Sequence, residues 1–268
     1  MKKIIAMLLA LSLVLAFAGC ASEKPAETTT APETTAAPEV TEEVPDTSET
    51  GPAEAEGTVM THAEYVAADL ESAVCVETYV QATQSWWNNQ ITVYAQSEDG
   101  AYFIYNMECS EENAAKLVPG TKIRVTGYKS EWSGEVEIVD GTFELLEGSY
   151  IAEPVDVTDL LGTDALIEHQ NEKVTFTGMT VEAANEAGDA FLYGWNGSGE
   201  AGTDSDLYFN ASVGGNTYTF VIEYYLCNET TDVYQTVTNL KVGDTIDMEG
   251  FLYWYNGSQP HITSIVVK

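Results

Sequence analysis

The sequence has little positive charge. Of its 268 residues, 10 are Lys or Arg and 43 are Asp or Glu, which gives a formal net charge of −33. Residues 58–268 alone carry −26, so the excess is not confined to the N-terminal part. Such a charge disfavours nucleic acid and other polyanions as partners, and it also serves solubility.

Cysteine is scarce as well. After Cys20 only Cys75, Cys109 and Cys227 remain, and three cysteines cannot form a fully paired framework. No C-x-x-C is present, which excludes the usual zinc and thioredoxin-like motifs. At most one disulfide can form within the chain. Cys75 with Cys109 is the pair we consider, and buried free thiols are the equal alternative.

A catalytic pattern is also missing. The three histidines, His62, His169 and His261, are scattered, and the chain has no G-x-S-x-G, H-E-x-x-H or phosphate-binding glycine loop. We therefore expect a non-enzymatic protein without a cofactor. An unrecognised hydrolase is the alternative, and it requires acidic residues arranged in a cleft.

One acidic loop has the composition of a calcium site. Asp204 and Asp206 follow Glu200 in a glycine-rich stretch, and calcium prefers oxygen ligands. The stretch lacks the regular ligand spacing of a known calcium loop. A solvated acidic loop is therefore the expected structure, and we predict no metal site.

The N-terminus reads MKKIIAMLLALSLVLAFAGCAS, in which two lysines precede a short apolar run. This pattern is typical of a secretory signal rather than a membrane span. Phe17–Cys20 resembles the bacterial lipobox, although Phe17 replaces the usual Leu. The resemblance implies a signal peptide over 1–19, lipidation of Cys20, and anchoring at the extracytoplasmic, cell-surface face of the membrane. An ordinary signal with a chance cysteine is the alternative.

Residues 20–57 follow as a Thr-, Pro- and Glu-rich segment. Positions 21–57 hold five of the eight prolines, ten acidic residues and one lysine, and no aromatic residue. Such a composition cannot bury enough apolar surface to offset the entropy of ordering. We predict an extended, disordered tether.

The remainder alternates apolar and polar residues, as half-buried antiparallel strands do. Residues 121–127 place Ile123 and Val125 on one face, and residues 134–139 set Val136 and Ile138 against Glu135 and Glu137. Residues 245–250 repeat the pattern. We expect an all-β protein with short helices.

The strand pattern occurs twice. At a constant offset of 123 positions, the segment from Leu117 matches the segment from Leu240, and their glycines coincide. The matched glycines are Gly120, Gly127 and Gly134 in the first copy and Gly243, Gly250 and Gly257 in the second. Each copy has three strand segments upstream, followed by a short helical segment at 110–117 or 231–240.

The order strand, strand, strand, helix, strand, strand resembles the OB fold, a five-stranded Greek-key barrel. The G-x-x-I-x-V-x-G pattern at Gly120–Gly127 and its counterpart at Gly243–Gly250 carry the resemblance. It implies two tandem OB-like barrels with helical lead-ins, over 58–148 and 149–268. A single β-sandwich built from both halves is the alternative.

The tryptophans are the main indication of function. On the OB interpretation all five fall in loops one–two and four–five, which flank the ligand face of such a barrel. Asparagines accompany them and offer amide hydrogen bonds. Packing of these rings within the protein is the structural alternative. The candidate ligand-binding residues are Trp86, Trp87, Asn88, Tyr94, Tyr102, Trp132, Trp195, Trp254 and Tyr255.

Stacking rings and amides suit sugars, and they also suit single-stranded nucleic acid. The first half has Lys122 and Arg124 on the outward side of one strand, so a small basic stripe is conceivable there. The surrounding charge is strongly negative. We therefore expect a binding or adhesion module for a glycan, cell-wall or protein partner. An extracellular nucleic-acid-binding protein, accessory to a nuclease, is the alternative.

Overall fold

The computed structural model describes residues 57–268, which belong to one compact unit. The predicted signal peptide, the lipidated Cys20 and the tether up to residue 56 lie outside the described residues. No helix within 57–268 has the length and apolar character needed to cross a bilayer.

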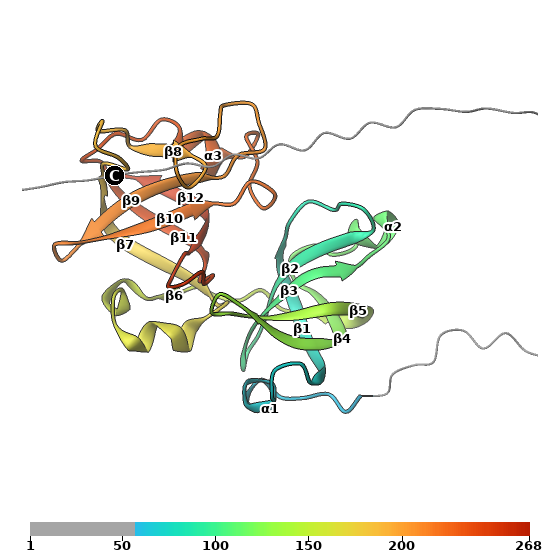
Figure 1. Ribbon diagram of the computed structural model, residues 1–268. Helices are drawn as coiled ribbons and strands as arrows, with labels where there is room; N and C mark the ends of the chain where they lie inside the picture. The colour runs from blue at the N-terminus through green and yellow to red at the C-terminus, as the bar shows by residue number, and fades with distance from the viewer. Residues whose placement is uncertain (1–56) are drawn as a thin grey trace, which may run out of the picture. The chain divides into compact units, whose positions relative to one another are not determined.

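The first half is a closed five-stranded barrel (Figure 1). The strands pair in the order β1-β2-β3-β5-β4, β4 returns to pair with β1, and β3 runs parallel to β5. Helix α2 lies between β3 and β4, as the OB fold requires. The elements are α1 (His62–Ala67), β1 (Ala73–Thr83), β2 (Gln90–Ser97), β3 (Gly100–Glu108), α2 (Glu111–Ala114), β4 (Thr121–Trp132) and β5 (Glu135–Ser149).

The second half forms its own closed ring of strands, with the same order of pairing as the first. Strand β7 pairs with both β11 and β9, β9 pairs with β10, and β10 runs parallel to β12, which pairs with β11. The elements are β6 (Val155–Asp156), η1 (Thr158–Leu160), η2 (Asp164–His169), β7 (Lys173–Glu182), β8 (Phe191–Tyr193), β9 (Leu207–Val213), β10 (Asn216–Ile222), α3 (Asp232–Val237), β11 (Thr245–Phe251) and β12 (His261–Val267). The prediction of two OB-like barrels is confirmed, and the single β-sandwich is wrong.

The repeated glycines have the same structural role in both halves. Gly120 and Gly243 open the fourth strand of each barrel with φ of 92° and 94°, a conformation that L side chains rarely adopt. Gly127 and Gly250 lie at β-bulges where the fourth and fifth strands approach closely. A Cβ on Gly127 would lie 2.7 Å from the Val139 carbonyl oxygen. The glycine pattern thus marks the bends that close each barrel.

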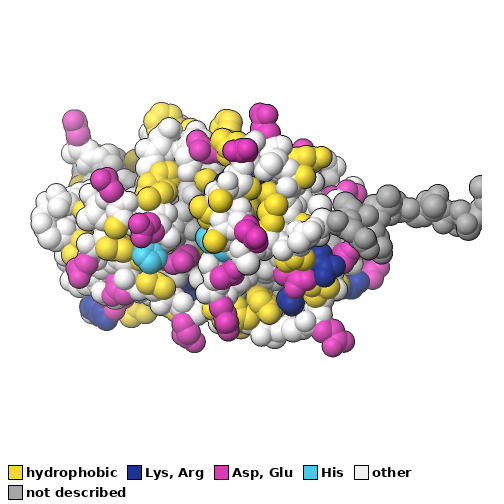
Figure 2. Space-filling model, turned by 90° about the horizontal axis from the view of Figure 1, so that it is seen from below, with side chains coloured by type: hydrophobic (Ala, Val, Ile, Leu, Met, Phe, Trp, Pro, Cys, Tyr) yellow, Lys and Arg dark blue, Asp and Glu magenta, His cyan; other side chains and the backbone are white. Residues whose placement is uncertain are grey.

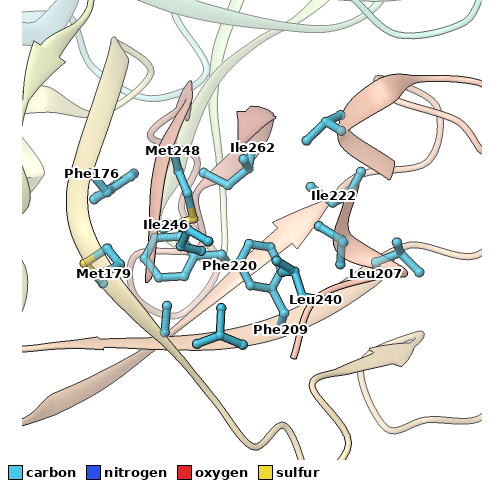
Figure 3. Close-up of a cluster of buried hydrophobic side chains, with 14 of the residues drawn as sticks. Phe176, Met179, Leu207, Phe209, Phe220, Ile222, Leu240, Ile246, Met248 and Ile262 are labelled. Carbon is cyan, nitrogen blue, oxygen red and sulfur yellow. The ribbon is translucent and has the colours of Figure 1, made fainter. Parts of the chain in front are cut away.

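Each barrel has its own apolar core. In the second, Phe176, Phe209 and Phe220 pack together with the aliphatic side chains of β11 and β12 (Figure 3). The segments that precede the barrels contribute to these cores, because Tyr65 of α1 is buried in the first core and Leu166 of η2 in the second. The three cysteines of the described region are buried and free, so Cys75 and Cys109 are not paired.

The outward face of β5 differs from the prediction. Glu135 and Glu137 were expected in solvent opposite Val136 and Ile138, yet both are buried. The second half covers this face. The backbone N–H of Trp254 donates to Glu135 Oε2 at 2.8 Å, and Asn171 Nδ2 donates to the Val136 carbonyl at 3.1 Å.

The two halves also share a small aromatic cluster. Tyr94 and Phe103 of the first barrel pack with Phe251 of the second, and Tyr253 borders them. Because β2 and β3 form the face that binds ligands in many OB folds, part of that face is occupied by the second half of the same chain. The part of the β2–β3 face that stays open, which includes Tyr105, lies beside this aromatic cluster.

Two local predictions were wrong at the level of single elements. The spacing of Asp232 and Gln235 predicts Asp232 as the N-cap of the second helix. Helix α3 instead begins at Asp232 with Thr231 at the N-cap position, so it starts one residue earlier than predicted. The aromatic and β-branched residues of 216–227 predict one long strand, but β10 ends at Ile222. The side chain of Glu223 stops it, because its carboxylate accepts the backbone N–H of Leu226 at 2.6 Å and holds the chain in a turn.

Candidate ligand-binding cleft

The Trp86–Trp87 pair divides its two rings between the core and the solvent. Trp86 packs against the first core, and its Nε1–H donates to the carbonyl of Cys109 at 2.7 Å. Trp87 is 80% exposed at the start of the two-residue turn formed by Asn88 and Asn89. Both asparagines have positive φ, which this residue type tolerates well. The hairpin thus places one tryptophan against the first core and the other in solvent.

A cleft of about 550 Å³ lies where the two halves meet. Aromatic rings from both halves line it, including Trp132 of the first and Trp195 of the second, which are 60% and 75% exposed. The complete lining is Gln84, Phe103, Tyr105, Trp132, Trp195, Asp206, Tyr208, Val221, Glu223, Tyr253, Tyr255, Gln259 and His261. Exposed rings beside polar groups can stack on a flat ligand and fix its orientation.

A second pocket of about 410 Å³ adjoins this cleft. Trp86, Trp87 and Tyr225 line it, and it shares Gln84 and Tyr105 with the cleft. Together the two hollows form one aromatic groove, which starts at the β1–β2 turn and crosses from the first half to the second.

The structure brings five of the nine candidate residues to this groove. Trp86 and Trp87 line the pocket, and Trp132, Trp195 and Tyr255 line the cleft. These five come from the loops that the OB interpretation singled out.

The other four candidates lie elsewhere. Tyr94 and Tyr102 are 1% exposed and cannot stack on a ligand, because alternation places both rings in cores. Trp254 is half-buried against the second core and contacts Gly134 of the first half. Asn88 lines a separate polar hollow with Asn106 and Asp140. None of these four side chains lines the groove.

Sequence reasoning missed the polar groups of the cleft. Asp206 directly precedes β9 and Glu223 directly follows β10, and the register pairs Leu207 with Ile222. Continuing that register places the two carboxylates opposite each other at one end of the ladder. The signal was hidden because residues 216–227 read as one long strand.

Both carboxylates are held in an unfavourable environment. Burial, followed by the charge of Asp206, raises the pKa of Glu223 to about 7. Burial also raises the pKa of Asp206, against the lowering effect of the Tyr224 N–H that donates to its Oδ1 at 2.8 Å.

His261 also faces the cleft, although it is only 5% exposed. Burial lowers its pKa to about 3, so the ring is neutral. Its Nδ1 lies 2.7 Å from the hydroxyl of Tyr94, and that oxygen accepts a hydrogen bond from Gln84 Nε2 at 3.4 Å. Among the described residues, Nδ1 is the only acceptor that the buried Tyr94 hydroxyl contacts, so we assign the hydroxyl proton to this contact. This assignment leaves Nε2–H as the donor of the ring.

The basic side chains of β4, which the nucleic-acid alternative requires, are neutralised within the protein. Lys122 and Arg124 both pair with Glu77, at 2.7 and 2.8 Å, and Arg124 also pairs with Glu144. Lys129 donates to the carbonyls of Val66 and Ala68. Acidic side chains are spread over the face in Figure 2, while the basic ones are few and lie beside acidic neighbours. A phosphate backbone would find little uncompensated positive charge among the described residues.

The acidic loop does not form a metal centre in this structure. Across residues 57–268 no three His, Cys, Asp or Glu side chains lie close enough together to hold a metal ion. Instead, the Ser205 carbonyl accepts from the Tyr234 hydroxyl at 2.9 Å, and Asp206 faces the cleft.

The strand order, the parallel third and fifth strands and the helix position define two OB-type barrels. No protein-family model and no curated protein matches the chain. Three solved structures are similar to part of its backbone. They are described as a tetrameric p202 HIN2, an Ifi202 HINa domain in complex with double-stranded DNA, and a replication protein A heterotrimer bound to single-stranded DNA.

Similarity to these structures is low. Their identities are 11%, 12% and 10%, and their TM-scores are 0.31, 0.33 and 0.28. The match covers 75%, 74% and 74% of this chain, and 96%, 98% and 49% of the respective neighbours. At these scores the comparison adds no argument about the ligand, and the OB assignment rests on the strand order.

Proposed function

We propose that this protein is a non-enzymatic binding module that holds a glycan in the aromatic groove between its two OB barrels. The observation that carries the proposal is the cleft itself, where exposed Trp132 and Trp195 face carboxylate, amide and imidazole groups. Aromatic faces stack on the apolar faces of sugar rings, and the polar groups satisfy sugar hydroxyls.

The electrostatics of the groove support a neutral or positively charged ligand. Asp204 lines the pocket, and Asp206 and Glu223 line the cleft, while neither lining includes a lysine or an arginine. An anionic ligand would have to approach these carboxylates without a compensating charge. A sugar without phosphate or sulfate groups avoids that cost.

Tryptophan fluorescence tests this proposal directly, because four of the five tryptophans line the groove. Titration of the full chain with a panel of neutral and amino oligosaccharides should give a saturable change in emission for at least one sugar. Tyr128→Ala removes an exposed ring outside the groove and serves as the control. A panel without any response would contradict the proposal.

Single-stranded nucleic acid is the second candidate. The observation that favours it is the run of exposed rings along the groove, on which bases also stack. Binding of an oligonucleotide that is strong at low salt and weakens steeply as salt rises would support this candidate. No binding at low salt would exclude it, because the electrostatic contribution is largest there.

We further propose that the module is held at the extracytoplasmic membrane face by lipidated Cys20, with residues 21–57 as a tether. The support is the sequence alone, in which the lipobox-like Phe17–Cys20 precedes a segment rich in Pro, Thr and Glu. Labelling of cells with a radioactive fatty acid should mark the wild-type chain and not Cys20→Ala. Equal labelling of both would contradict the anchor.

A further inference from the structure

Two carboxylates in the cleft lack a cationic partner. Asp206 and Glu223 take part in none of the ion pairs found within residues 57–268. Asp206 accepts a backbone N–H with Oδ1 only, so Oδ2 has no hydrogen-bond partner in the described part of the chain. Glu223 accepts the Leu226 N–H with Oε2. Both side chains line the cleft, so their remaining acceptor capacity is available to a ligand.

Aromatic rings surround the same carboxylates. Tyr208 lines the cleft beside them. Burial and then the negative charges of Asp206 and Glu223 raise the pKa of its hydroxyl to about 12. Tyr253 and Tyr255 belong to the same lining. The negative faces of aromatic rings attract cations, and they do so more strongly where water is partly excluded. Carboxylates and ring faces thus favour the same kind of group, a positively charged nitrogen.

His261 supplies an independent indication of a ligand. Its ring is more than nine-tenths buried, lines the cleft, and is stacked on Tyr253 with ring centroids 4.2 Å apart. Nδ1 is engaged by Tyr94, while Nε2 has no hydrogen-bond partner among the described residues. A fixed, neutral imidazole then offers one N–H to an acceptor in the cleft, such as a hydroxyl or ring oxygen.

We propose that the cleft selects a sugar that carries a free amino group. The ammonium group lies against Asp206 and Glu223, and an oxygen of the same ligand accepts a hydrogen bond from His261 Nε2. This inference rests on the proposed glycan function and specifies its ligand. The charge-assisted contacts are stronger than neutral hydrogen bonds, and they are lost when the amine is acetylated.

A matched pair of ligands tests the inference. The full chain is titrated by calorimetry at neutral pH with a glucosamine oligosaccharide and with its N-acetylated counterpart of equal length. The amino form should bind at least about tenfold more tightly. The double variant Asp206→Asn, Glu223→Gln should lose this preference and bind both forms alike. Glu186→Gln removes an exposed acid from the segment between β7 and β8, which lines neither hollow, and it should leave the preference unchanged.

The outcomes separate the two proposals. Equal binding of the two sugars, or tighter binding of the acetylated one, overturns the inference and leaves the glycan function standing. Binding of neither sugar also overturns the inference, and the response of the wider oligosaccharide panel then decides the glycan function. Circular dichroism checks that the double variant is folded. If it is not, each single substitution should reduce the preference by itself, and an unchanged preference in both overturns the inference.

Discussion

At the scale of single residues, burial on one side of the first hairpin decides what each tryptophan does. Trp86 is held by apolar contacts and by its hydrogen bond to Cys109, whereas Trp87 stands in solvent. Both rings line the pocket, but Trp86 also stabilises the first core, whereas Trp87 only forms part of the rim of the groove.

Substitution of these tryptophans should separate the two roles. Trp86→Ala removes buried contacts and leaves the Cys109 carbonyl without its donor, which should lower the free energy of unfolding by about 3 kcal/mol. Trp87→Ala should change it by less than about 0.5 kcal/mol, since the side chain is exposed. Urea unfolding measures both values, and equal losses in the two variants would contradict this division.

Glu135 is an acidic residue that is completely buried where the two halves meet. Burial raises its pKa to about 8, despite the hydrogen bonds from Trp254 and Gln170 to its Oε2. Within the described residues, its Oε1 and the nearby buried Asn171 Oδ1 both lack a partner. A proton on Oε1 would allow the two oxygens to hydrogen-bond, so the neutral acid suits the contact between the halves.

The pH dependence of stability follows from this pKa. The folded value of about 8 lies above the ordinary 4.5, so the native state binds the extra proton between these two values. The stability from this group is complete below about pH 4.5 and is lost as the pH rises towards 8. Glu223, with a pKa of about 7, acts in the same direction.

Glu135→Gln should reduce this loss. Between pH 5 and pH 8 the wild type should lose on the order of 2 kcal/mol more stability than the variant. Glu131→Gln changes an exposed acid of the neighbouring strand β4 and should behave like the wild type. Thermal unfolding at several pH values gives the comparison. Parallel curves for the wild type and Glu135→Gln would show that Glu135 is not protonated in the native state.

At the scale of elements, the closure of each barrel depends on the bulge between its fourth and fifth strands. Gly250 lies at such a bulge, and a Cβ there would overlap the backbone oxygen of His261. Backbone cannot move aside as a flexible side chain can, so the two strands must separate if the residue is enlarged.

Gly250→Ala should therefore destabilise the second barrel by about 3 kcal/mol or more. Gly141→Ala is the matched control, because its Cβ would meet Ile104 and Met107 at an ordinary distance of 3.4 Å. Denaturant unfolding of both variants provides the measurement. If the Gly250→Ala protein is as stable as the control, the close approach of the two strands does not require glycine at this position.

Much of the element order could be predicted because the signals are local. The hairpin turn at Gly214–Gly215, the N-cap at Ser110 and the bulge at Gly178 all depend on residues within a few positions. The turn between β2 and β3 is Glu98–Asp99, one residue before the Asp99–Gly100 pair that the sequence favours. The alternation of Ile246 and Met248 with Asp247 and Glu249 likewise identified the buried face of β11.

The cleft could not be predicted in the same way. Alternation predicts that the side chains of Glu135 and Glu137 point away from the core of their own barrel. It does not predict that the second half covers them. Asp206 and Glu223 are 17 positions apart, and only the register of β9 and β10 brings them together. Such contacts depend on the packing of whole elements, which sequence periodicity does not record.

At the scale of the whole molecule, the contact between the halves creates the candidate site. The backbone N–H of Ser85 donates to the Tyr225 carbonyl at 2.7 Å, and that of Asn256 donates to the Ser133 carbonyl at 2.7 Å. These bonds join loops of one barrel to loops of the other. A groove built from both halves requires such a fixed contact, because its rings must face one ligand together.

Removal of the two most exposed cleft rings tests the central claim most directly. The double variant Trp132→Ala, Trp195→Ala should bind a glucosamine oligosaccharide at least about tenfold more weakly than the wild type, because it loses a stacking surface from each half. Tyr128→Ala should bind as the wild type does. Calorimetric titration of the three full chains gives the affinities, and wild-type affinity in the folded double variant would contradict a binding site in this cleft.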